Sequence, residues 1–77
     1  MKLEIITPDK TIYKGEAELV QLPGIDGSFE ILNNHAPLIS ALQKGKIKVR
    51  KNGSDDFYEI NGGVIEVLEN KILILAE

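Results

Sequence analysis

The sequence contains no cysteine, no tryptophan and only one histidine among its 77 residues. Without cysteine there are no disulfides and no thiolate metal sites, so packing alone must stabilise the fold. No uninterrupted apolar run exceeds a few residues, which excludes a membrane-spanning helix, and the first residues show no signal-peptide pattern. The net charge of −3 argues against a dedicated nucleic-acid-binding protein. We therefore expect one small domain over residues 1–77, too short for a multidomain enzyme.

The apolar residues favour strands over helices. The chain has eleven Ile and four Val beside nine Leu and only four Ala. Side chains branched at Cβ are restricted in a helix but pack well on a pleated sheet. Glycine and proline interrupt the chain throughout, at Pro8, Gly15, Pro23, Gly24, Gly27, Pro37, Gly45, Gly53, Gly62 and Gly63. Short segments with regular turn signals predict an all-β sandwich or barrel.

The turn signals divide the chain into segments with strand character. We expect strands over residues 2–7, 11–14, 16–22, 28–32, 35–42, 45–51, 55–61, 64–68 and 71–76. Gly15 is expected to end the second of these strands. Pro37 lacks a backbone donor, so a strand that contains it is expected at a sheet edge or bulge.

The dipeptide Asn52-Gly53 marks the clearest hairpin, because it tolerates the positive φ angles of a type I′ turn. A two-residue loop here sets the register of residues 45–51 against residues 55–61. The pairs expected to face each other are Arg50 with Asp55, Lys46 with Glu59, and Ile47 with Tyr58. Charged and apolar groups are thereby sorted to opposite faces, and a slip of one residue would destroy that sorting.

A second hairpin is expected over residues 64–68 and 71–76, with its turn at Glu69-Asn70. On one face Val67 opposes Ile72 and Ile65 opposes Ile74, which makes that face wholly aliphatic. The other face carries Val64, Glu66, Leu68, Lys71, Leu73 and Leu75. This second face is more apolar than a solvated surface usually is, so we expect the opposite layer or another protein to cover it.

No catalytic or metal-binding constellation is visible. His35 has no nucleophile to activate and no second histidine beside which to bind a metal, so a surface or interface imidazole is the favoured interpretation. The pair Asp55-Asp56 indicates acid/base chemistry only weakly, since Asp55 is expected to pair with Arg50 at the hairpin end. No phosphate-binding loop is present. We expect no catalytic, cofactor or metal site.

Residues 44–51 hold more than half of the basic side chains. At strand period, Lys44, Lys46, Lys48 and Arg50 line one face, as in an electrostatic footprint for nucleic acid. Only Phe57 offers a stacking platform on that face, and the cross-strand acids neutralise two of the cations. A charge-paired outer face is the favoured interpretation. A small β-barrel protein that binds single-stranded nucleic acid through residues 44–51 is the alternative.

Residues 22–45 carry the most specific signal, LPGIDGSFEILNNHAPLISALQKG. This segment resembles the ε-subunit of F-type ATP synthases, which has a Pro-Gly or similar turn, a glycine-containing loop, His-Ala-Pro-Leu, and Leu-x-x-Gly. The resemblance extends to IITP at residues 5–8, GGVIEV at residues 62–67 and NKILILA at residues 70–76. It therefore covers essentially the whole chain.

The resemblance implies an antiparallel β-sandwich of about ten short strands in the foot of the central stalk. The family's subunit is not catalytic and has no cofactor. It binds the γ-subunit and rests on the c-ring, so that proton or sodium flow through the ring is coupled to ATP synthesis. The resemblance thus implies a rotor subunit with γ and the c-ring as partners. Its implied location is peripheral, on the cytoplasmic side of a bacterial inner membrane.

The resemblance also carries contact residues onto this chain. Those matching the family's γ contact are Thr7, His35 and Ser40. The ring contact is expected on loops at one end of the sandwich, at Gly27, Ser28, Glu30, Asn34 and His35. Ser28 stands where the family has a carboxylate. The turn that follows is expected at Asn33-Asn34, since asparagine accepts left-handed φ angles.

The sequence ends at Glu77, where most relatives continue into two C-terminal helices. In the family, those helices carry the inhibitory and nucleotide-sensing behaviour. We therefore expect these residues by themselves to couple the rotor without acting as a brake and without binding ATP.

Overall fold

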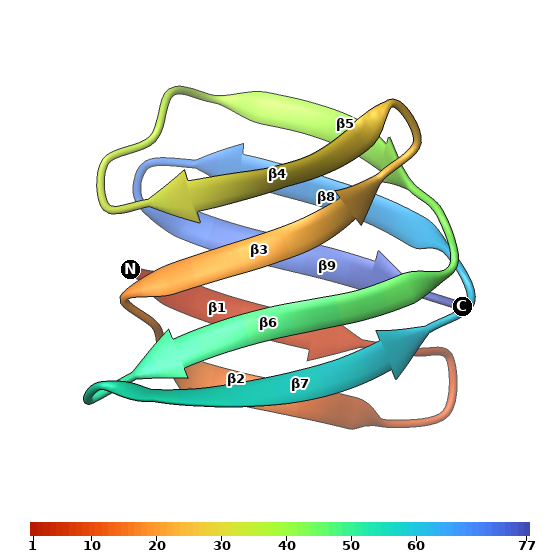
Figure 1. The fold of residues 1–77 in the computed structure, drawn as a ribbon, viewed down its shortest axis with the longest axis horizontal. Coiled ribbons are helices and arrows are strands. Elements are labelled where there is room, and N and C mark those ends of the chain that lie inside the picture. The colour runs from red at the N-terminus through yellow and green to blue at the C-terminus, as the bar shows by residue number, and fades with distance from the viewer.

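Short strands and turns follow one another along all of residues 1–77 in the computed structural model, and there is no helix (Figure 1). The strands are β1 (Lys2–Ile6), β2 (Thr11–Glu16), β3 (Leu19–Gly24), β4 (Gly27–Leu32), β5 (Leu38–Leu42), β6 (Gly45–Lys51), β7 (Ser54–Ile60), β8 (Gly63–Leu68) and β9 (Lys71–Ala76). The all-β prediction is confirmed, with nine strands in place of about ten.

The strands form two layers. Strands β4, β3, β6 and β7 make the layer nearer the viewer in Figure 1, and β5, β8, β9, β1 and β2 make the layer behind it. The layers join where β3 meets β5, at the pair Gly24–Leu42. Every pairing is antiparallel except that of β1 with β9, which run parallel. The expected antiparallel sandwich is thus confirmed, with this one parallel pairing as a difference. A parallel pair needs a long connection, and here the rest of the chain provides it.

The core fills the space between the two layers. Successive side chains of a strand point to opposite faces, so every second residue of a strand can be buried. Sixteen buried side chains form one cluster, and all of them are apolar. Its largest fully buried members are Leu3, Ile5, Leu22, Ile31, Ile47, Ile65, Ile74, Val20 and Val49. No buried side-chain nitrogen or oxygen lacks a hydrogen-bond partner.

Both predicted hairpins form in the predicted register. Asn52 has φ 52° and Gly53 has φ 76°, the two positive values that a type I′ turn requires. The turn brings Arg50 opposite Asp55, Lys46 opposite Glu59, and Ile47 opposite Tyr58. In the second hairpin Val67 pairs with Ile72 and Ile65 with Ile74, as expected.

Seven of the nine strands differ from the prediction at one or both ends, and three of these differences concern Gly15, Pro23 and Pro37. Strand β2 continues through Gly15 to Glu16, because an edge strand bonded only to β1 tolerates a glycine without a packed side chain. Strand β3 includes Pro23, which lies beyond the last residue paired with β6, so its missing donor breaks no bond there. Strand β5 begins only at Leu38, after Pro37, and the two residues before that proline are not extended into it.

Two tyrosines meet across the open edges of the two layers. Strand β2 is bonded only to β1 and β7 only to β6, and Tyr13 and Tyr58 contact each other edge to face with ring centroids 5.8 Å apart. Burial is the main cause that raises the pKa of both phenols, and the charge of Asp56 raises it further. The neutral phenols therefore seal this edge.

This raised pKa predicts a loss of stability at alkaline pH. A phenol whose pKa is raised on folding contributes stability that is complete below the unfolded value of about 10 and lost as pH rises through the folded value. The melting temperature of Tyr58→Phe should match the wild type at pH 7 and fall less steeply between pH 9 and pH 12. Circular dichroism melts across that range test this, and identical slopes for the two chains contradict it.

A glycine at the start of β8 is required by its surroundings. Gly63 has φ 151°, and a Cβ atom there would lie 2.4 Å from the carbonyl oxygen of Leu75. Gly63→Ala should therefore lower the free energy of unfolding by about 2–4 kcal/mol, the range of strained or overpacked sites. Gly15→Ala is the control, because a Cβ there meets no atom closer than 3.7 Å. Urea denaturation measures both, and equal losses would contradict the assignment.

Candidate functional site

The outer side of the back layer carries a row of apolar side chains, one from each of four neighbouring strands. The row consists of Ala41 on β5, Val64 on β8, Leu75 on β9 and Ile6 on β1, which pair in that order. The side chain of Val64 is 43% exposed and that of Leu75 is 48% exposed. Ile39, two residues before Ala41 on β5, is 73% exposed on the same side. We call the first four residues the apolar row.

Farther along the same strands the surface becomes charged. The next two rows contain Glu66, Leu73, Glu4 and Lys14, and then Leu68, Lys71, Lys2 and Glu16. These residues line a shallow groove of about 620 Å³. None of its charged side chains forms an ion pair, because the single ion pair of the protein is Arg50–Asp55 on the other layer. The groove thus presents charges of both signs to its surroundings.

The apolar row has no cover from the rest of this chain. The front layer packs on the inner side of the back layer, where Ile65 and Ile74 are fully buried, and leaves the outer side open. Of the two covers expected for this face, the opposite layer is therefore excluded. An exposed apolar patch bordered by polar residues is typical of an interaction site.

Two of the three expected γ contacts lie next to this row. Thr7 follows Ile6 at the β1 end of the row, and Ser40 precedes Ala41 at the β5 end. His35 lies outside the row, in the loop between β4 and β5. Both are thus sequence neighbours of the row, but Ser40 pairs with the buried Ile65 and so lies on the inner side of β5, and His35 lies apart from them.

The five expected ring contacts follow β4 and do not gather at one end of the sandwich. Gly27 and Ser28 begin β4, Glu30 lies within it, and Asn34 and His35 lie in the loop beyond its far end. Figure 1 shows the β3–β4 turn and the β4–β5 loop at opposite ends of the molecule. Strand β4 is bonded only to β3, so its other side is a free edge. The five residues therefore form a line along this edge, which we call the β4 edge.

The loop between β4 and β5 is held by contacts to distant segments. The N-terminal ammonium donates to Asn33 Oδ1 at 2.8 Å, and the backbone nitrogen of Asn34 donates to Asn70 Oδ1 at 2.8 Å. Asn34 has φ 65°, which confirms the turn expected at Asn33-Asn34. His35 Nδ1 lies 2.7 Å from the carbonyl oxygen of Ala36. Sequence reasoning missed Asn70, since an asparagine in a turn gives no sign of its distant partner.

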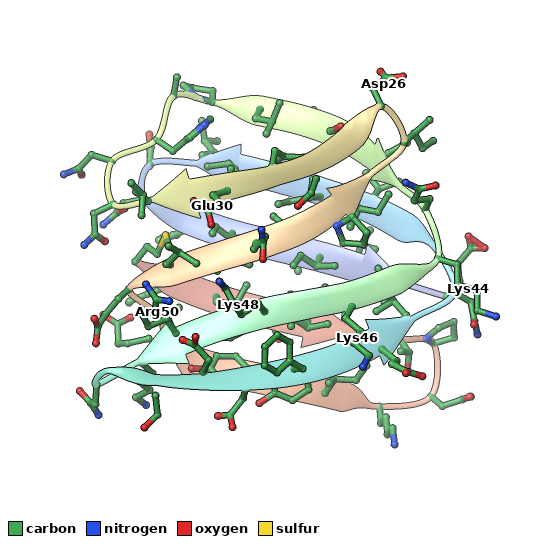
Figure 2. All side chains as sticks on the ribbon, viewed as in Figure 1. Asp26, Glu30, Lys44, Lys46, Lys48 and Arg50 are labelled. Carbon is green, nitrogen blue, oxygen red and sulfur yellow. The ribbon has the colours of Figure 1, made fainter.

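The basic side chains of β6 lie on the outer side of the front layer, as expected. Figure 2 shows Lys46, Lys48 and Arg50 along that strand, with Lys44 beyond its start. Arg50 Nε donates to Asp55 Oδ1 at 2.8 Å, and this hydrogen bond lowers the pKa of the Asp55 carboxyl. Lys46 faces Glu59 across the strands. Two cations are thus matched by acids, and the nucleic-acid alternative is not favoured.

The remaining candidates for chemistry do not assemble a site. Asp56 pairs with Val49 and so lies on the side of β7 opposite Asp55, which separates the two carboxylates. No three His, Cys, Asp or Glu side chains are placed to hold a metal ion. The structure contains no helix of the length and apolarity that a membrane span requires. The apolar row and the β4 edge are therefore the surfaces on which a function can be based.

Relatives of known identity share both the sequence and this architecture. The ATP synthase epsilon chain of Chlorobium limicola is 44% identical, and the match covers 99% of this chain and 88% of that protein. The epsilon chain of Leptospira interrogans is 39% identical, and this chain spans only 61% of its length. A chain of the Euglena gracilis mitochondrial ATP synthase has the same fold, with a TM-score of 0.90 and 25% identity over 96% of this chain and 48% of that one.

The family model agrees with these relatives. A model described as ATP synthase, delta/epsilon chain, beta-sandwich domain, matches residues 1–77. A Tetrahymena thermophila ATP synthase chain, 18% identical with a TM-score of 0.83, supports the fold alone. The resemblance noted in residues 22–45 is thereby confirmed over the full length of the sequence. The chain belongs to the delta/epsilon chain family of ATP synthases and forms its β-sandwich domain.

Proposed function

We propose that this chain is a rotor subunit of an F-type ATP synthase, which links the γ-subunit to the c-ring and couples ion flow to ATP synthesis. Bacterial epsilon chains are among its relatives, and the Euglena gracilis relative was solved together with F1 and a c-ring. The corresponding location is peripheral, on the cytoplasmic side of a bacterial inner membrane. Its task is mechanical, and no catalytic step is assigned to it.

The apolar row carries the proposal for γ. Each square ångström of apolar surface removed from water contributes about 25 cal/mol, so the half-exposed Val64 and Leu75 favour a permanent partner. Thr7 and Ser40, the residues that match the family's γ contact, are sequence neighbours of Ile6 and Ala41 at the two ends of the row. A stable complex buries on the order of 800 Å² on each partner, so γ must cover the adjoining groove as well as the row. We infer that γ lies across the row.

The β4 edge carries the proposal for the ring. Its residues are mainly polar, with Ser28, Glu30 and Asn34 all exposed, which suits contact with polar loops at a membrane surface. Strand β4 is paired with β3 at all six of its positions, so this edge is held by a rigid ladder. Binding residues commonly lie on segments that a rigid scaffold positions. We infer that the β4 edge rests on the c-ring.

A matched pair of charge substitutions tests the γ surface. The wild-type chain should elute with purified γ as a one-to-one complex at micromolar concentration. Leu75→Glu places a carboxylate in the apolar row and should weaken binding at least about tenfold, the effect of about 1.4 kcal/mol. Phe57→Glu, at a side chain 60% exposed on the front layer, should leave binding unchanged. Separate elution of wild type and γ, or equal losses in both variants, would contradict the assignment.

Cysteine crosslinking tests the ring surface. The sequence has no cysteine, so single substitutions give unambiguous products. Ser28→Cys and His35→Cys, at the two ends of the β4 edge, should both crosslink to a cysteine in the polar loop of the ring. Asp9→Cys and Asn52→Cys lie in the β1–β2 and β6–β7 turns, away from that edge (Figure 1), and should not. Crosslinks from the two control positions alone would place the ring against the opposite edge.

A further inference from the structure

One residue of the β8–β9 turn joins three segments that are distant in the sequence. The Oδ1 atom of Asn70 accepts a hydrogen bond from the backbone nitrogen of Asn34, 2.8 Å away. The carbonyl oxygen of Asn70 accepts another from the backbone nitrogen of Lys2, 3.1 Å away. The chain start, the β4–β5 loop and the β8–β9 turn lie together at the left of Figure 1. Asn70 therefore connects the edge of the front layer to the back layer.

The backbone of this turn would accommodate glycine more readily than asparagine. Glu69 has φ 50° and Asn70 has φ 60°, so both central residues of the turn are left-handed. Glycine enters this region without steric cost, and asparagine is among the few other residues that tolerate it. A glycine at position 70 would keep the turn but remove the Oδ1 atom. The side chain of Asn70 thus provides a contact that the turn itself does not need.

The β4–β5 loop has few other contacts that fix it. Within the loop, the backbone nitrogen of His35 donates to Leu32 at 3.2 Å, and the side chain of Asn33 accepts from the N-terminal ammonium. Asn34 is exposed and left-handed, with φ 65°, and its nitrogen donates to no group other than Asn70 Oδ1. Without this acceptor the turn that precedes His35 keeps only the contact of Asn33 with the N-terminus as a hydrogen-bonded link to the back layer.

We propose that Asn70 is a positioning residue, whose side-chain oxygen holds the turn at Asn34-His35 in the conformation that meets the partner. This rests on the proposed function, in which the turn forms one end of the β4 edge. A loop ordered before binding loses less conformational freedom when it binds, so the hydrogen bond improves contact at His35 without touching the partner. Ser28, at the other end of the edge, does not depend on it.

Two substitutions separate the side-chain contact from the turn. Asn70→Gly keeps a residue suited to left-handed φ and removes the acceptor, whereas Asn70→Asp keeps an oxygen at the same position. Amide hydrogen exchange of Asn34 in the chain alone should accelerate about fivefold to tenfold in Asn70→Gly, as for one lost hydrogen bond, and stay near wild type in Asn70→Asp. The melting temperature of Asn70→Gly should remain within a few degrees of wild type.

The same substitutions are then placed in assembled ATP synthase that carries one crosslinking cysteine. Asn70→Gly should reduce the yield of the crosslink from His35→Cys to the ring several-fold. It should leave the yield of the crosslink from Ser28→Cys unchanged. With Asn70→Asp, the crosslink from His35→Cys should return to its original yield. Unchanged exchange at Asn34 in Asn70→Gly overturns the proposal. Faster exchange with unchanged crosslinking from position 35 overturns the positioning role and leaves the proposed function intact. If neither Ser28→Cys nor His35→Cys crosslinks to the ring in protein that retains Asn70, the ring contact and the positioning role are both overturned.

Discussion

A β-strand has two faces, and a two-layer fold can bury only one of them. In this chain the buried face of the strands is apolar, and it supplies all of the sixteen core residues except Met1 and Ala17. The outer face of the front layer is mostly polar and charged, with Phe57 and Leu32 as its separate exposed apolar side chains. The outer face of the back layer is not, because Val64 and Leu75 continue an apolar row across four strands. The proposed contact with γ is based on this exposed apolar row.

A domain of this size also gains stability when it remains bound in a complex. A chain of 77 residues buries only about 60% of the surface that its unfolded form exposes, and this chain has no disulfide to compensate. A partner that binds the folded chain alone stabilises it by mass action. Cover over Val64, Leu75 and the neighbouring Ile39 therefore adds to the stability of the sandwich as well as forming the contact.

Local features of the structure could be predicted from the sequence, and non-local ones could not. The β6–β7 register followed from Asn52-Gly53, because a two-residue turn fixes the pairing of the strands on either side of it. The parallel pairing of β1 with β9 brings Leu3 beside Ile72, and no local pattern in either strand specifies so distant a partner. The turn signal at Pro23 predicts the end of a strand, whereas only the position of Pro23 relative to β6 decides whether its missing donor matters.

The candidate contact residues show the same division. Their identity came from the resemblance in residues 5–8 and 22–45, but their arrangement came from the fold. Expected at one end of the sandwich, they lie along an edge, because Ser28 and His35 stand at opposite ends of β4. Asn70 could not be predicted at all. In the sequence it is an ordinary turn residue, and only the folded chain brings its side chain to Asn34.

The two proposed contacts belong to different layers, so force between them must cross the sandwich. The β4 edge is part of the front layer and the apolar row is part of the back layer. Besides the core, the layers are joined by hydrogen bonds at the β3–β5 junction, where the backbone of Gln43 donates to Pro23 at 2.8 Å and its side chain donates to Gly24 at 2.9 Å. Next to this junction β3 and β4 are closely packed, since a Cβ atom on Gly24 would lie 2.6 Å from the carbonyl oxygen of Gly27 on β4. A rigid junction beside the start of the β4 edge suits a subunit with the proposed role of transmitting rotation.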